Sequence, residues 1–493
     1  MSPAAPLVEE IVPAPAPLDA CACFAGLPFL TFLDSALVHD SLGRYSFLAA
    51  DPWTAVRAKG LLTQELRDGA WTRVNGDPLT QVRSLLAPHA DAGVADLPPF
   101  QGGAAGYVGY DWGAALERVP RARYDDLTVP DVLLGLYDWV LAWDHRTGRA
   151  WAISSGAPAQ GPARAERAAR RLAFVTERLR AGRDAARGNG RCAAEPPDPP
   201  TPPSRAVGRP SAPSYPLPGV PGVRSTFTHE GYGDAVRRVI EYIHAGDIFQ
   251  ANLSQRLEAP IDGTPLALYA RLRERSPAPF AAFLDYGDLV VASASPERFL
   301  RVDPGGRVET RPIKGTRPRG LGPEHDAALG RALAESAKDR AENVMIVDLL
   351  RNDLSRVCRP GTVRVPELVA LEHYATVHHL VSTVVGELAP GHDALDLLRA
   401  AFPGGSITGA PKVRAMQIIA ELEPTQRAAY CGAIGYLSTS GALDMSIVIR
   451  TYLVRGGDVY FQVGGGIVAD SDPEEEYGET LVKARGLIAA LAP

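Results

Sequence analysis

The sequence of 493 residues lacks any uninterrupted apolar run near the roughly 20 residues that a membrane-spanning helix needs. Its first twenty residues lack a basic start followed by an apolar stretch, so no secretory signal is readable there. Positive charge is not in excess either, because 51 Lys and Arg residues face 57 Asp and Glu residues, for a formal net charge of −6. We therefore expect no nucleic-acid partner and no membrane partner, and we expect a local site for any anionic ligand.

Cysteine is also scarce, with five residues at unrelated spacings: Cys21, Cys23, Cys192, Cys358 and Cys431. An odd number of cysteines spread over a long chain argues against a disulfide framework, and their spacings do not suit a zinc site. These features predict a protein of the reducing cytoplasm.

Glycine and proline, by contrast, are abundant, with 48 and 43 residues. Much of the excess is local, since 11 of the 26 residues over 196–221 are proline. Such a stretch cannot donate the backbone hydrogen bonds of a helix or sheet, so it behaves as an extended spacer. We therefore predict an N-terminal part over 1–187, a proline-rich linker over 188–222 and a C-terminal part over 223–493.

Apolar periodicity predicts several helices. The clearest lies over 164–187, where Leu172, Val175 and Leu179 recur at three- and four-residue spacing beside a basic face. Further helices are predicted over 232–244, 326–337, 342–351 and 394–401, and strands over 137–143, 248–256, 289–294, 434–437, 447–453 and 459–463. Because strand-to-strand steps are mixed with strand-to-helix steps, the α+β class is predicted and a regular Rossmann alternation is not.

The segment DSDPEEEYGETLVK near the C-terminus is rich in acids at a predicted helix start. Pro473 suits the first turn, Asp472 or Ser471 can cap it, and the helix dipole favours acids there. Glu476 and Glu479 are three residues apart and therefore neighbours on one face, as a pair of oxygen ligands for a hard cation must be. Two interpretations stay open, a solvated helix start and part of a metal site.

Glu342 stands at the start of a strongly apolar helix, as a first-turn acid or as a third carboxylate ligand. Magnesium usually takes only one or two protein carboxylates, so three glutamates from two segments would suffice. Two glycine-rich runs, 404–411 and 464–466, can bring backbone amides to an anion, although tight turns are the alternative. Arg450 lies in the predicted strand 447–453, and its charge needs a partner, such as a ligand carboxylate, if that strand is buried.

Several longer motifs resemble those of the chorismate-utilising enzymes and occur in that family's order. They are 293–299 (SASPERF), 311–317 (RPIKGTR), 341–353 (AENVMIVDLLRND), 403–416 (PGGSITGAPKVRAM), 431–438 (CGAIGYLS) and 464–484, preceded by 43–48 (GRYSFL) and 98–111 (PPFQGGAAGYVGYD). The resemblance covers nearly the whole chain, the proline-rich linker excepted. It implies an anthranilate-synthase-like chorismate-binding fold, with two packed, mainly antiparallel sheets, helices outside them, and the N- and C-terminal parts interwoven in one globule.

The family includes anthranilate, aminodeoxychorismate, isochorismate and salicylate synthases, and the resemblance implies roles for residues of this chain. Glu342, Glu476 and Glu479 match the positions that hold Mg²⁺, which would bind the ring carboxylate of chorismate. Glu297 matches the general acid that protonates the departing C4 hydroxyl, and His379 matches a ring-site histidine, although a packed histidine is the alternative. The substrate-binding positions are matched by Gln250, Thr408, Tyr436, Arg450, Gly464, Gly465, Gly466 and Lys483.

Two positions separate the members of the family. Gln250 stands where isochorismate and salicylate synthases have a water-activating lysine, and because an amide cannot usefully accept that proton, ammonia becomes the expected nucleophile. Lys314 stands where anthranilate synthases typically have the alanine of P-I-A-G-T. A lone loop lysine is usually a solvated charge, but in this motif it resembles the covalent nucleophile of aminodeoxychorismate synthases.

The resemblance thus implies a transferase that converts chorismate and ammonia to 4-amino-4-deoxychorismate for para-aminobenzoate formation, on a route to folate or to a secondary metabolite. The alternatives are an anthranilate synthase and a catalytically silent chorismate-binding subunit. Ammonia has to come from a separate glutamine amidotransferase subunit, because the cysteines lack the surroundings of a glutaminase nucleophile. A further set of residues resembles the family's tryptophan pocket, regulatory or structural: Ser35, Arg44, Tyr45, Ser46, Pro277, Ala278 and Pro279.

Overall fold

The computed structural model describes residues 5–38, 42–91, 93–187, 212–374 and 377–492. Cys192 and residues 188–211 of the predicted linker lie outside the described residues. Over the described ranges, no helix is long and apolar enough to cross a membrane.

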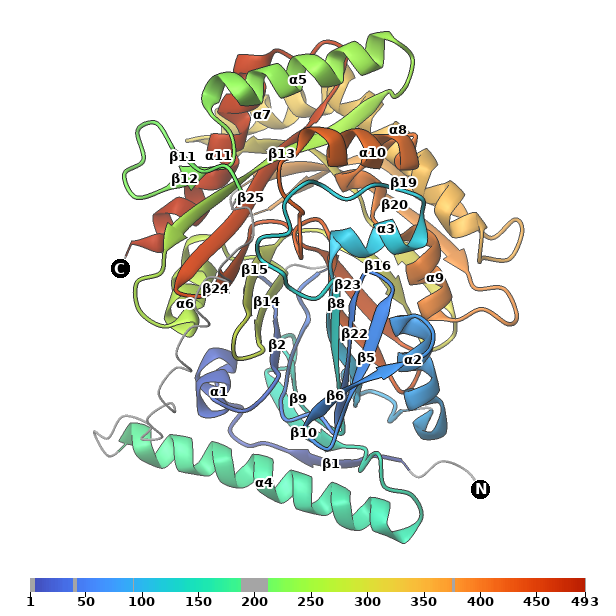
Figure 1. Ribbon diagram of the computed structural model, residues 1–493. Coiled ribbons are helices and arrows are strands. Elements are labelled where there is room, and N and C mark those ends of the chain that lie inside the picture. Colours follow the sequence, from blue (N-terminus) through green and yellow to red (C-terminus); the bar gives the residue numbers. More distant parts are fainter. Residues whose placement is uncertain (1–4, 39–41, 92, 188–211, 375–376, 493) are drawn as a thin grey trace.

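Two large sheets form the centre of the molecule (Figure 1). The first has 13 strands among the described residues, in the order β1 (Leu7–Glu10), β10 (Arg149–Ser154), β9 (Trp139–Asp144), β3 (Tyr45–Ala49), β2 (Leu30–Asp34), β14 (Phe280–Asp285), β15 (Val290–Ser295), β24 (Thr451–Arg455), β25 (Asp458–Ile467), β13 (Gln250–Pro260), β12 (Arg224–Ser225) and β11 (Tyr215–Pro216), with β21 (Gly409–Ala410) beside β13. The second has 12, in the order β18 (Ile313–Pro318), β20 (Val377–Glu387), β17 (Arg307–Thr310), β16 (Arg298–Val302), β23 (Leu443–Ile447), β22 (Ala433–Ser438), β7 (Gly103–Val108), β8 (Val132–Tyr137), β4 (Thr54–Lys59), β5 (Leu62–Arg67) and β6 (Ala70–Val74), with β19 (Arg364–His373) beside β20.

Helices lie outside these two sheets (Figure 1). They are α1 (Pro17–Cys23), α2 (Pro78–Leu86), α3 (Gly113–Leu116), α4 (Pro162–Arg187), α5 (His229–His244), α6 (Pro265–Arg275), α7 (Pro323–Glu335), α8 (Ala337–Ser355), α9 (Ala394–Ala401), α10 (Lys412–Leu422) and α11 (Pro473–Leu491), with short 3₁₀ turns η1 (Ala87–His89), η2 (Tyr110–Trp112) and η3 (Gly405–Ile407). The predicted α+β class, with mainly antiparallel sheets and outer helices, is confirmed.

Each sheet combines strands from both sides of the predicted linker. β2 pairs with β14 in the first sheet, and β7 pairs with β22 in the second. Residues of both sheets also share buried apolar clusters, in which Tyr107 of the second sheet packs with Val291 of the first. The two sheets therefore pack face to face over a common core.

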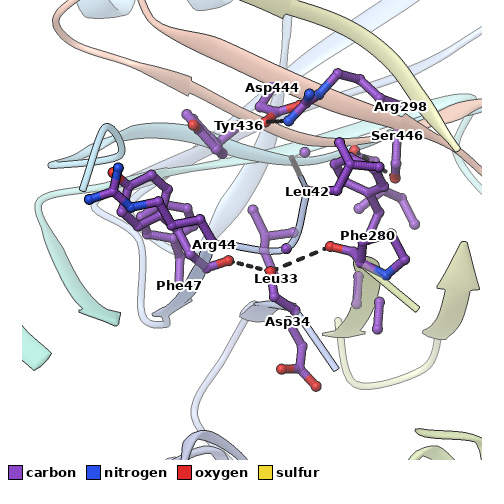
Figure 2. Close-up of a pocket in the computed structure, with 18 of the residues that line it drawn as sticks. Leu33, Asp34, Leu42, Arg44, Phe47, Phe280, Arg298, Tyr436, Asp444 and Ser446 are labelled. Atoms are coloured by element: carbon purple, nitrogen blue, oxygen red, sulfur yellow. Dashed lines mark hydrogen bonds and ion pairs between the residues drawn. The ribbon is translucent and has the colours of Figure 1, made fainter. Parts of the chain in front are cut away.

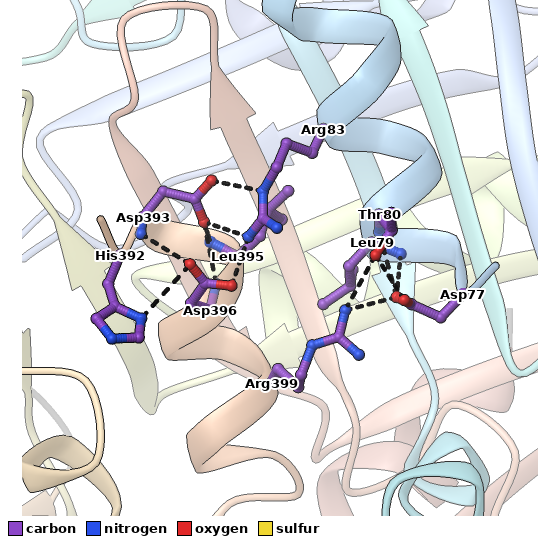
Figure 3. Close-up of polar contacts among 9 residues, drawn as sticks. All are labelled: Asp77, Leu79, Thr80, Arg83, His392, Asp393, Leu395, Asp396 and Arg399. Carbon is purple, nitrogen blue, oxygen red and sulfur yellow. Dashed lines mark hydrogen bonds and ion pairs between the residues drawn. The ribbon is translucent and has the colours of Figure 1, made fainter.

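Ion pairs between α2 and α9 tie an N-terminal helix to a C-terminal one (Figure 3). Arg83 contacts Asp393 at 2.7 Å and Asp396 at 2.6 Å, and Arg399 contacts Asp77 at 2.7 Å. Asp393 also caps α9, because its side chain accepts hydrogen bonds from the first turn of that helix. One residue thus serves both the local helix start and the contact between distant segments.

The predicted helices are confirmed, including the long one over 164–187, where Leu172, Val175 and Leu179 are buried. Two predicted strands are wrong. The run 137–143 is split at Asp138, since β8 belongs to the second sheet and β9 to the first. The run 447–453 is likewise split between β23 and β24. Both halves of each run are buried, so apolar residues lie on either side of the point where the chain changes sheet. The sequence pattern therefore looks like one continuous strand.

At the second of these breaks, two segments that each pass from one sheet to the other lie side by side. We call such a segment a crossing. β15 pairs with β24 in the first sheet, while β16 pairs with β23 in the second. Glu297 lies where the chain passes from β15 to β16, and Arg450 lies where it returns from β23 to β24. The Ala294 amide donates to the Arg450 carbonyl at 3.1 Å, and the Ile447 amide donates to the Glu297 carbonyl at 3.0 Å. A carboxylate and a guanidinium are thereby held at one junction between the sheets.

Candidate active site

Glu297 is fixed at this junction with its carboxyl group buried, and the residue is only 6% exposed. Burial raises its pKa to about 7, against the opposing effects of a hydrogen bond from the Ser406 side chain and of the Lys314 charge. A large share of the Glu297 carboxyl groups is therefore protonated near neutral pH. This is the protonation state that a general acid requires.

Lys314 projects from β18, next to a local irregularity of that strand. The pairing of β18 with β20 shifts register between Lys314 and Thr316, and Gly315 between them has a φ of +76°, which favours glycine. The Lys314 Nζ atom donates to the Ser406 carbonyl at 3.0 Å. Burial lowers the Lys314 pKa, although the charges of Glu342 and Glu297 oppose this shift.

His379 lies on β20 directly opposite Thr316, and its Nδ1 atom is 2.9 Å from the Thr316 hydroxyl. The imidazole is buried, and this burial, with the neighbouring Arg450 charge, lowers its pKa to about 4. His379 is therefore neutral at physiological pH. Burial also lowers the Arg450 pKa, and Glu297 is the charged group that opposes this shift. Arg450 thus places a cation near Glu297 and His379, from the crossing between β23 and β24 and not from within the predicted strand.

Glu476 and Glu479 lie in the first turns of α11, which Asp472 caps and Pro473 begins, as predicted. Both face the glycine run of β25: a Cβ added to Gly465 would lie 2.9 Å from Glu476 Oε2 and 3.6 Å from Glu479 Oε1. Glu476 accepts a hydrogen bond from the Ser471 hydroxyl at 2.6 Å. The two carboxylates thus lie against the Gly465 backbone, and a side chain at this position would displace Glu476.

Lys483 competes for one of these carboxylates. Its Nζ atom is 2.6 Å from Glu479 Oε1, and it also donates to the Gly464 carbonyl at 2.8 Å. The side chains of Glu479 and Lys483 are 52% and 41% exposed, so this end of the cluster is open to solvent.

Glu342 approaches from α8, on the other side of the cluster. Burial raises the pKa of Glu342, and the negative charges of Asp339 and Glu476 raise it further. Lys338, one turn earlier on α8, is 3.9 Å from Glu476. The helices α8 and α11 thus bring the three predicted metal glutamates into mutual electrostatic contact. Among the described residues, no three His, Cys, Asp or Glu side chains are already grouped to hold a metal ion.

Gln250 and Thr408 lie at the neighbouring ends of β13 and β21. Gln250 is 1% exposed, and a Cβ added to Gly466 would lie 2.2 Å from its Nε2 atom. Its Oε1 atom has no hydrogen-bond partner in the described part of the chain. The Thr408 hydroxyl donates to the Gly404 carbonyl at 3.0 Å, so this side chain holds the glycine-rich loop in shape.

Tyr436 does not join this cluster. The prediction that it contacts a substrate carboxylate beside Arg450 does not fit its position. It points from β22 toward Phe100, with ring centroids 4.8 Å apart, and toward Phe47. It lines a separate cavity of about 310 Å³ (Figure 2). Alternation along β22 gives Tyr436 and Ile434 the same face, toward this cavity.

Four of the seven residues of the predicted tryptophan pocket line the same cavity: Ser35, Arg44, Tyr45 and Pro279. Ser46 does not line it, and its hydroxyl instead contacts His145 at 2.7 Å. Ala278 is buried and Pro277 is exposed, and neither lines the cavity. Arg298, which pairs with Asp444 in the wall, directly follows Glu297, so one peptide bond joins the cavity wall to the acid (Figure 2).

Two residues of the cluster were missed by the sequence analysis. Thr316 contacts His379, and Ser406 contacts both Glu297 and Lys314. Both belong to recognised motifs, RPIKGTR and PGGSITGAP, in which the lysine and the glycines drew attention first. The available signal was a hydroxyl side chain close in sequence to a residue with a predicted catalytic or substrate-binding role, Thr316 near Lys314 and Ser406 near Thr408.

Known proteins resemble this chain over most of its length. Residues 44–489 match the family described as chorismate binding enzyme. The chain is 41% identical over 470 residues to aminodeoxychorismate synthase component 1 of Salmonella typhimurium, covering 94% of this chain and 93% of that protein. It is 43% identical over 442 residues to anthranilate synthase component 1 of Thermus thermophilus, covering 87% of each. The crystal structure of anthranilate synthase component I from Streptococcus pneumoniae superposes with a TM-score of 0.75 at 31% identity, over 92% of this chain and 94% of that one. The chain therefore belongs to the chorismate binding enzyme family.

Proposed function

We propose that the chain is the large subunit of an aminodeoxychorismate synthase, converting chorismate and ammonia into 4-amino-4-deoxychorismate. Overall identity does not decide between this activity and that of an anthranilate synthase, because relatives with either name are about equally similar. The observation that carries the proposal is Lys314, an amine with a lowered pKa in the same cluster as the acid Glu297.

In the first step, the neutral Lys314 amine attacks C2 of the chorismate ring. The two conjugated ring double bonds shift, from C1=C2 and C5=C6 to C1=C6 and C4=C5. The C4–O bond breaks, and the oxygen leaves as water with the proton of Glu297. The Lys314 nitrogen, now bonded to C2, carries a positive charge and is therefore able to leave again. The Glu297 carboxylate is ionised at this point.

In the second step, ammonia attacks C4, both ring double bonds shift back to C5=C6 and C1=C2, and the C2–N bond breaks. The electron pair of that bond returns to Lys314 as the neutral amine. The new C4 ammonium group gives one proton to Glu297, which restores the starting protonation of the site. Two displacements thus place nitrogen at C4 and retain the enolpyruvyl group, whereas direct attack of ammonia at C2 would lead to anthranilate.

Arg450 and the glycine run of β25 are suited to hold the two carboxylates of the substrate. The Arg450 guanidinium offers a charged, bidentate donor. At Gly465, the absence of a side chain allows a ligand to approach the backbone, as it allows the approach of Glu476. The Gln250 Oε1 atom, which has no partner among the described residues, accepts hydrogen bonds and cannot usefully take a proton. This favours ammonia over activated water as the nucleophile.

Glu342, Glu476 and Glu479 would hold a magnesium ion. Their oxygen donors suit a hard cation. Burial raises the pKa of Glu342 and Glu476, with a smaller contribution from neighbouring carboxylates, and a divalent charge would favour their ionised forms. When bound, the ion would supply Lewis-acid polarisation of the conjugated ring carboxylate. Glu479 would have to exchange Lys483 for the ion.

Two further partners belong to the proposal. A separate glutaminase subunit would supply ammonia, which is supported by the relatives named as component 1. Tryptophan would fill the cavity beside Tyr436, whose aromatic walls suit an indole. Calorimetric titration with tryptophan tests this point, and an absence of binding heat would leave the cavity a structural feature. A cytoplasmic location remains a prediction.

Product analysis tests the activity. The purified chain is incubated with chorismate, magnesium and ammonium, and products are identified by mass spectrometry while pyruvate is assayed. We expect 4-amino-4-deoxychorismate without pyruvate. Anthranilate with equimolar pyruvate would identify an anthranilate synthase, and a lack of any conversion would favour a silent binding subunit.

A further inference from the structure

Ser406 touches both reacting side chains of the cluster with different atoms. Its backbone carbonyl accepts a hydrogen bond from Lys314 Nζ at 3.0 Å. Its side chain also acts on the Glu297 carboxyl group, because hydrogen bonding from Ser406 lowers the Glu297 pKa. One residue of the loop between α9 and α10 therefore bridges an acid and an amine that come from two other segments.

The backbone around Ser406 is held from several directions. Ser406 is the middle residue of the 3₁₀ turn η3, and the Thr408 hydroxyl closes this turn onto the Gly404 carbonyl at 3.0 Å. The buried Arg427 donates to the Ile407 carbonyl at 3.0 Å. A Cβ added to Gly405 would lie 2.6 Å from Leu349 of α8, so the turn packs closely on that helix. These contacts hold the backbone of the turn, and with it the Ser406 carbonyl, in a fixed orientation.

We propose that Ser406 is a positioning residue that orients Glu297 and Lys314 together for the two displacements at chorismate. The inference rests on the proposed function and adds a residue to it. A carbonyl oxygen can only accept a hydrogen bond, so the Lys314 amine must direct an N–H bond toward it. The lone pair of the neutral amine is then directed away from Ser406. The Ser406 hydroxyl, by donating to one carboxyl oxygen of Glu297, leaves the acidic proton on the other oxygen. Both reactive features are then directed away from the loop.

A residue that only shaped the loop would not change the titration of Glu297. The Ser406 hydrogen bond favours the ionised carboxylate and lowers the Glu297 pKa, against the larger effect of burial. Loss of the hydroxyl must therefore raise the pH at which the acid loses its proton. The Lys314 contact uses the backbone, so it persists when the side chain is changed.

The test compares Ser406→Ala and Ser406→Thr with the wild-type chain, using chorismate, ammonium and magnesium across a pH series. For Ser406→Ala we expect kcat to fall by about tenfold with little change in KM, because orientation and not binding is lost. The alkaline limb of the kcat profile should move upward by about half to one pH unit. Ser406→Thr, which keeps the hydroxyl, should restore both the rate and the limb.

Ser84→Ala is the matched control, because Ser84 is an exposed serine on α2 whose hydroxyl donates to the Gln81 carbonyl of the same helix. It should leave both readouts unchanged. If Ser406→Ala fails to fold by circular dichroism, Ser406→Cys keeps the bulk with only a weak donor and should show the same two changes. An unaltered alkaline limb in a folded Ser406 variant would overturn the positioning role while leaving the proposed function intact. Anthranilate as the wild-type product would instead overturn the proposed function.

Discussion

At the scale of single residues, burial shifts the pKa values of Glu297 and Lys314 in opposite directions, and both shifts favour the neutral form of the side chain. It disfavours charge on both, raising the pKa of the carboxyl and lowering that of the amine. The Coulomb attraction between the two opposes both shifts. Burial thus brings the two pKa values closer together, and this increases the share of sites that hold a neutral acid beside a neutral amine, the pair that the first displacement consumes.

The acid can be tested through pH. Because Glu297 must be protonated to act, and its pKa is about 7, the rate should fall as pH rises through that value. Lys314 must be neutral, so the rate should also fall toward low pH and give a bell-shaped profile. Glu297→Gln should lower kcat by roughly 10²–10⁴ and remove the alkaline limb while chorismate still binds. A near-normal rate would assign the acid to another group.

The nucleophile can be tested by trapping it. Wild-type chain incubated with chorismate and magnesium but without ammonium should accumulate a ring fragment on the peptide RPIKGTR, seen as added mass. Lys314→Ala should show no adduct and should lose amination at C4 while its thermal unfolding stays near that of the wild type. If Lys314→Ala aminates C4 at the wild-type rate, the covalent route is wrong.

At the scale of elements, sequence patterns predicted helices and helix caps correctly where the signal lies on one face, or at one end, of a single element. The helix over 164–187 has a single buried stripe, and the cap of α11 follows from Asp472 and Pro473 alone. The same patterns could not locate Asp138 or Arg450, because the apolar residues on either side are buried in both sheets. Tyr436 was misplaced because a motif gives the identity of a residue and not the face toward which its strand directs it.

The meeting of α8 and α11 predicts how the protein responds to metal. Chelation of magnesium should abolish turnover, because three glutamates facing a dianionic substrate repel it, and added magnesium should restore turnover. Glu479→Gln should raise the magnesium concentration needed for half-maximal rate, whereas Glu475→Gln, on an exposed residue of the same helix, should not. Full turnover in a metal-free preparation would contradict the assignment of all three glutamates.

The contact between α2 and α9 allows a stability prediction. Asp393 both caps α9 and pairs with Arg83, so Asp393→Ala should lower the free energy of unfolding by about 1 kcal/mol or slightly more. Asp393→Asn keeps the capping oxygen and loses only an exposed ion pair, so its loss should be about 0–1 kcal/mol. Urea denaturation distinguishes these values. Equal losses in the two variants would show that the ion pair, and not the cap, carries the stability.

At the scale of the whole molecule, the interlocking of the two sheets makes the site a product of the complete chain. Glu297 and Arg450 meet because two separate segments change sheet at the same place, and α8 and α11 add their glutamates from opposite sides. The family resemblance of the motifs predicted most of these residues, and the fold explains why they lie far apart in the sequence. The distances between these residues could not be predicted from the sequence, because no sequence pattern shows where the chain passes from one sheet to the other.

The ammonia supply is the remaining property of the whole molecule, and it can be argued from the thiols. A glutaminase of the cysteine type needs a thiolate nucleophile. Burial raises the thiol pKa to about 11 in Cys358 and to about 12 in Cys431, and it raises the pKa of Cys21 even further. These three thiols therefore stay protonated and unreactive at neutral pH.

Ammonium salts should support amination by the purified chain, with a rate that follows free ammonia as pH rises toward the limit set by Glu297. Glutamine should support it only after a glutaminase subunit is added, and glutamine-dependent turnover by the purified chain alone would show that it contains a hydrolytic site of its own.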